Sequence, residues 1–298
     1  MRRPPSLALF ITLPIMGWAL AFPLIKVALE DLSFINLTLL RFTVACSALL
    51  VILGLQRRRF APLHKRDVIP LFLLGFFGVM VYHLGLNYGE QYVSPGAASL
   101  IVATIPVLVV ILAVMFLDER VTPRKVGGIG LSLTGLVILT VWGSEATIEV
   151  DYVVGALAVL LAAVMGAVYT VAGKKMLERY SALSLTLYAM LLGSIGLLPL
   201  VRWSFVTEVA SMSWETGAAV VFLGLVSTIV SYALWYMALE VKGASELSVY
   251  LYAVPVISTL VSYLLFDDPI TPLFVVGGGL VILGVAVVNR ARRVVQPQ

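Results

Sequence analysis

Long apolar runs follow one another along almost the whole chain, separated by short stretches that contain charges, proline or glycine. A helix needs about 20 apolar residues to cross roughly 30 Å of hydrocarbon. Ten runs come close to or exceed that length. They predict helices at residues 6–29, 34–55, 68–88, 95–117, 123–143, 152–176, 182–201, 214–239, 244–266 and 270–289. We therefore expect an all-α integral membrane protein with ten transmembrane helices.

Composition supports a membrane protein and excludes several other classes. Apolar residues make up 61% of the 298 residues and charged residues 12%, so a soluble fold could not bury the apolar excess. The net charge of +4 is too small to indicate a nucleic-acid partner, and one cysteine cannot form a disulfide framework. With two histidines, one cysteine and no Walker loop, we expect no metal site, no nucleotide-driven pump and no cofactor.

The charged residues predict the orientation in the membrane. Cytoplasmic loops are rich in lysine and arginine. If the amino terminus is cytoplasmic, most of the 20 basic residues fall in cytoplasmic segments, including the run Arg57, Arg58 and Arg59. Acidic residues such as Asp31 and Asp151 then fall on the other side. We predict a multi-pass protein of a bacterial inner membrane, surrounded by lipid, with both termini cytoplasmic.

The chain repeats itself at an offset of 149 residues. Pro106 then falls on Pro255, Asp118 on Asp267 and Gly135 on Gly284. We expect two five-helix halves, residues 1–149 and 150–298, and an odd number of helices inserts the second half upside down. The basic run at 57–59 accordingly aligns with 206–208, which holds no basic residue.

Inverted repeats are typical of secondary transporters, which alternate between two mirror-related states around a midplane site. We therefore expect a transporter of small molecules rather than an enzyme, because no convincing nucleophile, metal set or acid–base pair is present for a lipid-modifying enzyme. A passive channel is a third hypothesis, and non-saturating flux would distinguish it.

Polar and aromatic residues line one face of the third and eighth predicted helices. Tyr82, His83 and Asn87 share that face in the third helix, and Ser231 and Trp235 in the eighth. Polar groups facing hydrocarbon are costly, so we expect this face to line a substrate cavity. Hydrogen bonding between helices without a ligand is the alternative.

The fourth and ninth helices each contain a proline, Pro106 and Pro255. A proline inside a helix bends it and frees a carbonyl, so both residues are candidate hinges. Ser248 and Tyr252 precede Pro255 in the ninth helix and are candidate substrate contacts. Close helix packing is the alternative role for such residues.

Trp18 in the first helix and Tyr169 in the sixth are further candidate substrate contacts, because aromatic walls suit a flat or amphipathic ligand. Core packing is the alternative for both. Lys26 precedes Glu30 by one turn and predicts an ion pair between them. Arg41 is expected to pair with Asp31 or Glu30, and either cation could attract a carboxylate.

Several short motifs resemble one known family. The motifs are residues 116–123 (FLDERVTP), 127–131 (GGIGL), Trp18 to Lys26, Arg41-Phe42, and Ala238-Leu239 with Ala244-Ser245. In this order they resemble the EamA domain, the repeat unit of the drug/metabolite transporter superfamily. Two departures are Asp118, where members usually have glycine, and residues 19–21, which are less polar than in many members.

This resemblance implies two inverted five-helix repeats and transport of amino acids or related metabolites, often outward. The tyrosines and tryptophans make the chain similar to the family's aromatic amino-acid exporters. Multidrug efflux of lipophilic cations is the alternative, and the absence of a mid-membrane carboxylate argues against it. His83 is the buried group that could carry a proton in a coupled antiporter, and a role only as a hydrogen-bond partner is the alternative. We expect a functional monomer, with a dimer as the alternative.

Overall fold

The computed structural model describes residues 7–119, 122–142, 150–266 and 272–290, and all of its regular elements in these ranges are helical. The helices of the first half are α1 (Leu7–Ala19), α2 (Ala21–Ala28), α3 (Phe34–Gln56), η1 (Arg57–Arg59), η2 (Lys65–Asp67), α4 (Val68–Gly75), η3 (Phe76–Val81), α5 (Tyr82–Gly89), α6 (Pro95–Val102), α7 (Ile105–Phe116) and α8 (Pro123–Trp142). Those of the second half are α9 (Val150–Met176), α10 (Ala182–Ser194), η4 (Ile195–Leu200), α11 (Trp203–Ser211), α12 (Trp214–Phe222), η5 (Leu223–Val230), α13 (Ser231–Val241), α14 (Ala244–Ser248), η6 (Val249–Tyr252), α15 (Ala253–Phe266) and α16 (Pro272–Arg290).

Eight helical stretches within the described residues are long and apolar enough to cross a membrane. They are Leu7–Ala28, Phe34–Arg59, Lys65–Gly89, Pro95–Phe116, Asp151–Met176, Ala182–Leu200, Trp214–Val241 and Ala244–Phe266. Large apolar side chains such as Leu13, Leu50 and Met115 are exposed on the outside of the bundle, as contact with lipid requires. The chain is therefore an all-α, multi-pass membrane protein. Helices α8 and α16 lie where the fifth and tenth spans are predicted, and the count of ten remains a prediction.

Most of these stretches are interrupted, and the interruptions of the third and fourth stretches correspond between the halves. The stretch with Pro106 breaks between α6 and α7, and the stretch with Pro255 passes through the 3-10 turn η6. Proline removes a backbone donor, which explains breaks at these places. The third stretch of each half contains a π-helical segment, η3 and η5, which the apolar pattern does not predict.

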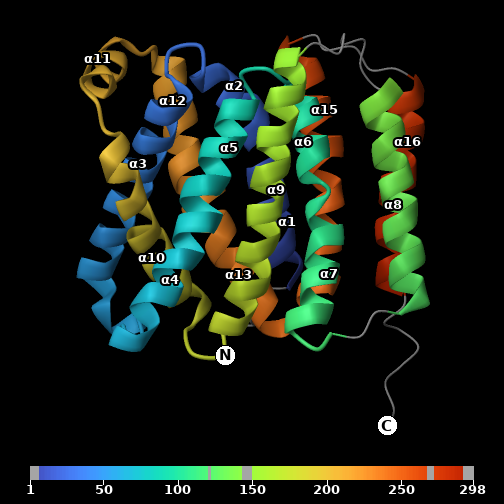
Figure 1. The fold of residues 1–298 in the computed structure, drawn as a ribbon, viewed down its shortest axis with the longest axis horizontal. Helices are drawn as coiled ribbons and strands as arrows, with labels where there is room; N and C mark the ends of the chain where they lie inside the picture. The colour runs from blue at the N-terminus through green and yellow to red at the C-terminus, as the bar shows by residue number, and fades with distance from the viewer. Residues whose placement is uncertain (1–6, 120–121, 143–149, 267–271, 291–298) are drawn as a thin grey trace.

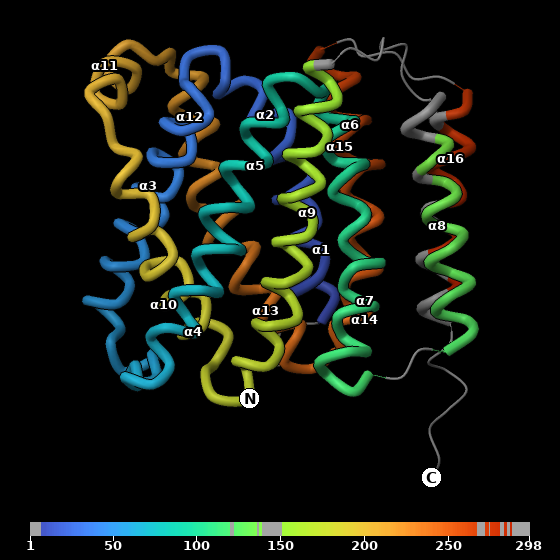
Figure 2. The backbone as a smooth tube through the Cα atoms, viewed as in Figure 1, coloured from blue at the N-terminus to red at the C-terminus, as the bar shows by residue number. Residues whose placement is uncertain are grey.

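The halves are interleaved rather than side by side. Helix α1 packs against α13 and α5 against α9, and α4 packs against α10 while α3 packs against η5. Each of these pairs joins one half to the other, and the tube in Figure 2 shows segments of distant colour running together through the bundle. The membrane-length helices run nearly parallel to one another, and the short α11 lies across them at one end of the bundle (Figure 1).

Glycines allow the closest of these contacts. Gly75 of α4 lies against Gly193 of α10, and a Cβ atom on Gly75 would collide with the carbonyl oxygen of Ala189. Helices α8 and α16 form a pair of their own at one edge of the bundle (Figure 1). There Gly284 packs against the backbone of Gly128, as expected for small residues between membrane helices.

At each end of the bundle a group of polar contacts joins the first half to the second, and we call each group a latch. At one end Asp31 Oδ2, between α2 and α3, accepts hydrogen bonds from Ser213 N (2.8 Å) and Thr216 Oγ1 (2.7 Å) at the start of α12. These bonds hold the pKa of Asp31 below its ordinary value. At the other end the Tyr180 hydroxyl donates to Asp67 Oδ2 (3.0 Å). The offset of 149 carries Asp31 to Tyr180 and Asp67 to Thr216, so the latches occupy equivalent positions. In one latch the first repeat position holds the carboxylate and the second the hydroxyl, and in the other the positions relate the opposite way.

The structure corrects the two predicted ion pairs. Lys26 Nζ lies 4.3 Å from the centroid of the Phe266 ring, and no ion pair joins it to Glu30 among the described residues. Asp31 belongs to the latch, while Arg41 lies inside the bundle and bonds to hydroxyls of η5. The sequence spacing does not show that Arg41 faces inward rather than toward the surface acids.

Part of the predicted charge pattern lies outside the described residues. This applies to the basic residues Arg2, Arg3, Arg120, Arg292 and Arg293 and to the acidic residues Glu145, Glu149, Asp267 and Asp268. Connections within the described residues do alternate between the two ends of the bundle. Arg57, Arg58 and Arg59 form η1 at the end where α3 finishes, and Asp31 lies at the opposite end.

Candidate functional site

A cavity lies inside the bundle, where helices of both halves meet. It contains about 740 Å³ of space between atoms, including its open part. The part of it open to the centre of a water-sized sphere is about 70 Å³, below the range of about 300 to 1,000 Å³ that is usual for small-molecule sites. The lining residues are Trp18, Ala21, Phe22, Arg41, Gly78, Tyr82, His83, Leu86, Ser99, Val102, Ala103, Ile105, Gly166, Tyr169, Thr170, Ser227, Tyr232, Trp235, Leu251 and Val254.

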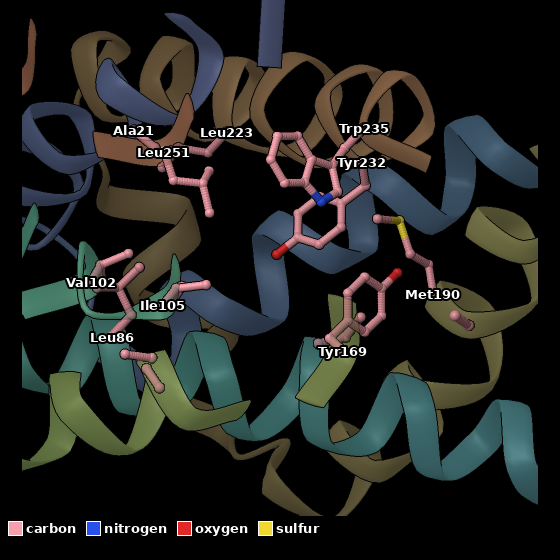
Figure 3. Packing of buried hydrophobic residues seen from close by; sticks show 14 of the residues in the cluster. Ala21, Leu86, Val102, Ile105, Tyr169, Met190, Leu223, Tyr232, Trp235 and Leu251 are labelled. Atoms are coloured by element: carbon pink, nitrogen blue, oxygen red, sulfur yellow. The ribbon is translucent and has the colours of Figure 1, made fainter. Parts of the chain in front are cut away.

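Aromatic rings form a continuous wall of this cavity. The Trp18 ring makes edge-to-face contacts with Tyr232 and Trp235, with centroids 5.5 and 5.2 Å apart. Tyr232 makes a third such contact with Tyr169, at 5.4 Å. Figure 3 shows Tyr232 and Trp235 on one side and Tyr169 across from them. Edge-to-face contacts leave ring faces and edges available to a ligand with an apolar or aromatic surface.

Glycine makes room for these rings. A Cβ atom on Gly78 of η3 would collide with the Tyr169 ring, and one on Gly166 of α9 would lie 3.1 Å from the Tyr82 ring. The aromatic side chains therefore lie directly against the backbone of neighbouring helices. Trp18 is fixed as well, since its indole Nε1 donates to the carbonyl oxygen of Ser227 at 3.0 Å.

Arg41 is the only one of these lining residues with a full formal charge at neutral pH. Its side chain is buried. The Nε atom donates a hydrogen bond to Thr228 Oγ1 at 2.8 Å, and Nη2 donates one to Ser227 Oγ at 3.2 Å. Nη1 has no hydrogen-bond partner among the described residues. A buried guanidinium without a counter-ion is unfavourable, and a carboxylate is the ligand that it binds best.

His83 lies between rings and is held by the backbone. Its Nδ1 lies 2.7 Å from the carbonyl oxygen of Val79, and the ring makes edge-to-face contacts with Phe42 and Tyr82. Because a carbonyl only accepts, Nδ1 carries a proton, and Nε2 is an acceptor whenever the ring is neutral. The cavity lining thus holds one guanidinium cation and one imidazole ring.

The structure brings five of the expected contact residues together at the cavity, namely Trp18, Tyr82, His83, Tyr169 and Trp235. The other four do not belong to its lining. Asn87 Nδ2 donates to Thr38 Oγ1 at 2.9 Å, Ser231 Oγ to the Val226 carbonyl and Ser248 Oγ to the Ser245 carbonyl. The Tyr252 hydroxyl is buried without a partner among the described residues.

The two helix breaks reach the cavity. Val102, Ala103 and Ile105 line it immediately before Pro106, and Leu251 and Val254 line it before Pro255. The candidate hinge of each half therefore lies next to the cavity wall.

Two lining residues, Arg41 and Tyr232, are not among the site residues predicted from the sequence. The sequence places Arg41 near the surface acids, and Tyr232 lies next to Ser231 in the eighth predicted helix. The signal for Tyr232 is its helical spacing from Trp235. The position of Arg41 depends on Ser227 and Thr228, which are nearly 190 residues away along the chain.

Comparison with known families gives one match that covers both halves. The model of the EamA-like transporter family matches residues 6–141 and again residues 153–290. The two matches fall within the two halves that the internal repeat predicts.

Similar proteins share most of the length of the chain. An uncharacterized transporter of Archaeoglobus fulgidus is 39% identical over 95% of this chain and 98% of its own length. A "Probable terminal-alkyne amino-acid exporter" of Streptantibioticus cattleyicolor is 35% identical over 94% of this chain and 92% of its own. A solved crystal structure superposes with a TM-score of 0.74 at 24% identity, covering 97% of this chain and 98% of the other, and shows the same fold.

Proposed function

Because the chain belongs to the EamA-like transporter family, whose model matches it twice, we propose that it is a secondary carrier for amino acids with apolar or aromatic side chains. It moves them outward by alternating access, without any covalent step. The observation that carries this proposal is the aromatic cavity with Arg41 as the single full charge of its lining.

The cavity suits a zwitterion with an apolar side chain. Arg41 Nη1 is available to the carboxylate, and the aromatic wall of Trp18, Tyr232 and Trp235 offers ring faces to the side chain and to the ammonium group. The relative named as an amino-acid exporter supports the same substrate class.

The competing proposal is efflux of lipophilic cations. The aromatic wall would also accept such ligands. Arg41 opposes them, because a buried positive charge in the lining repels a cation where the local dielectric is low. The cavity therefore favours substrates with a carboxylate.

We further propose the topology that this function needs. Residues 1–149 and 150–298 form inverted five-helix halves with α8 and α16 as their last spans, both termini are cytoplasmic, and the membrane is a prokaryotic inner membrane. The crosswise packing of α1 on α13 and α5 on α9 supports the pseudo-two-fold arrangement. Pro106 and Pro255 are the hinges at which the wall bends between states.

Each expected site residue has a role in this proposal. Trp18, Tyr82, Tyr169 and Trp235 contact the apolar part of the substrate, and His83 accepts a hydrogen bond from its ammonium group. Asn87, Ser231, Ser248 and Tyr252 support the wall from outside the lining. Asn87 bonds to Thr38 of α3, Ser231 and Ser248 bond to carbonyls of their own helical stretches, and Tyr252 gains a partner in another conformation.

Binding by purified protein tests this proposal. L-phenylalanine, phenylpropionate and phenethylamine differ only in which charged groups they carry, so their dissociation constants separate the carboxylate from the amine. We expect phenylalanine and phenylpropionate to bind and to lose at least ten-fold in affinity in R41M, as loss of a charge-assisted hydrogen bond requires. Preferential binding of phenethylamine by the wild type would support cation efflux instead.

A further inference from the structure

Glu90 is a buried acid one helical turn beyond the cavity. It follows α5, and its amide donates to the carbonyl oxygen of Leu86, which lines the cavity. Four residues of helix advance the chain by about 6 Å, so the carboxylate lies between the cavity and the end of the bundle that carries the Asp31 latch. The side chain is 5% exposed.

The carboxylate has no partner in this conformation. Neither Oε1 nor Oε2 has a hydrogen-bond partner among the described residues. Arg41 and Lys26 are the charged groups that act on it electrostatically, from α3 and α2. No ion pair within 4 Å joins Glu90 to either of these two described cations. A buried carboxylate without a partner is costly, so a partner is expected in another step of the cycle.

Lys26 lies on α2 at the same helical distance beyond the cavity as Glu90 does on its helix. It lies four residues after Phe22, which lines the cavity, and its Nζ lies over the Phe266 ring. A carboxyl group and an amine thus lie one turn beyond the cavity toward the same end, and no ion pair occupies either of them among the described residues.

The fold itself does not require an acid at this position. The 149-residue offset carries Glu90 to Leu239, which is fully buried at the opposite end of the bundle. A buried leucine therefore satisfies the same packing position in the other half. A buried carboxylate without a partner costs folding free energy that a buried leucine does not. Stability alone does not explain the carboxylate.

We propose that Glu90 and Lys26 form a second, transient subsite that binds the zwitterionic head group of the substrate as it leaves the cavity. Glu90 binds the ammonium group and Lys26 the carboxylate, while the apolar side chain is still leaving the aromatic wall. This subsite rests on the proposed amino-acid carrier and makes the carrier selective for zwitterions in the exit step.

Proteoliposomes with purified protein test the subsite. The variants are Glu90→Gln, which keeps the shape and removes the charge, and Glu90→Leu, which copies Leu239. We expect both to bind L-phenylalanine with the wild-type dissociation constant, measured by tryptophan fluorescence, and to transport it with a maximal rate reduced at least ten-fold. Glu215→Gln is the matched control, because Glu215 is exposed at the same end, and it should leave both values unchanged.

The outcomes separate the subsite from the carrier function. Wild-type maximal rates in both Glu90 variants would overturn the subsite and leave the carrier intact. Loss of phenylalanine binding in both variants would make Glu90 part of the framework of the cavity and would also overturn it. A wild-type protein that neither binds nor transports phenylalanine would overturn the carrier function and the subsite together.

Discussion

Asp118 has a backbone conformation that an aspartate rarely adopts. Its φ is 52°, in the left-handed region, immediately after α7 ends with Leu117 as the C-cap. Helices often end with glycine in this conformation because glycine has no Cβ atom to crowd the backbone. The sequence shows only that aspartate replaces the usual glycine of the family, and the structure gives the physical meaning of that departure.

Asp118→Gly is therefore expected to stabilise the protein. Removing the Cβ atom should raise the free energy of unfolding by about 0.5 kcal/mol, since left-handed backbone is mildly strained for aspartate. The thermal unfolding midpoint in detergent measures this. A lower midpoint for the glycine variant would show that the carboxylate makes a contact worth more than the strain.

Arg41 shows what sequence reasoning misses at this scale. The sequence shows an arginine within a predicted helix, and the acids nearest to it along the chain, Glu30 and Asp31, are therefore the expected partners. Its actual partners, Ser227 and Thr228, belong to η5 in the other half, and only tertiary packing brings them together. By contrast, aromatic residues such as Trp18 and Trp235 are predictable, because polar or aromatic residues deep in apolar helices have few alternatives.

At the scale of elements, the close approach of α4 and α10 depends on Gly75. Gly75→Ala should prevent that approach and lower the unfolding midpoint, because the added Cβ atom meets the backbone of Ala189 and Gly193. Gly54→Ala is the matched control. A Cβ atom on Gly54, in α3, would have no neighbouring atom within 4 Å, so alanine there should raise helix stability by up to about 1 kcal/mol. Equal effects of the two substitutions would contradict this contact.

The apolar pattern predicts where helices lie better than how they are built. It predicts one helix at residues 95–117 with a hinge at Pro106, and the structure divides this stretch into α6 and α7 at that place. The π-helical segments η3 and η5 have no sequence signal, since they depend on packing against the other half. Helix α11, between α10 and α12, is likewise not predicted.

At the scale of the whole molecule, the two latches hold the ends of interleaved halves. Hydrogen bonds from Ser213 and Thr216 stabilise the charged form of Asp31 and lower its pKa below the ordinary value of 3.8. The stability that this latch contributes is therefore complete above about pH 4 and is lost as the pH falls through the lowered pKa.

The Asp31 latch predicts an acid dependence that asparagine removes. As the pH falls from about pH 4 through the lowered pKa of Asp31, the unfolding midpoint of the wild type should fall more steeply than that of Asp31→Asn, because only the carboxylate takes up a proton. Thermal unfolding in detergent across that range measures the difference. Parallel curves for the two proteins would show that the latch makes no charge-dependent contribution.

The repeat is the most informative sequence signal for the molecule as a whole. It predicts two equivalent halves, because repeated glycines and prolines are needed at repeated contacts and breaks. It does not give the substrate, since the cavity combines residues that differ between the halves. Arg41, for example, corresponds to Met190.

The most direct test of the central claim is saturable uptake of labelled L-phenylalanine and L-leucine into proteoliposomes, with unlabelled amino acids and lipophilic cations as competitors. The account predicts saturable uptake that unlabelled amino acids inhibit and lipophilic cations do not, and its loss in Trp235→Ala protein that remains folded and monodisperse. Flux of lipophilic cations alone, with no uptake of either amino acid, would contradict it.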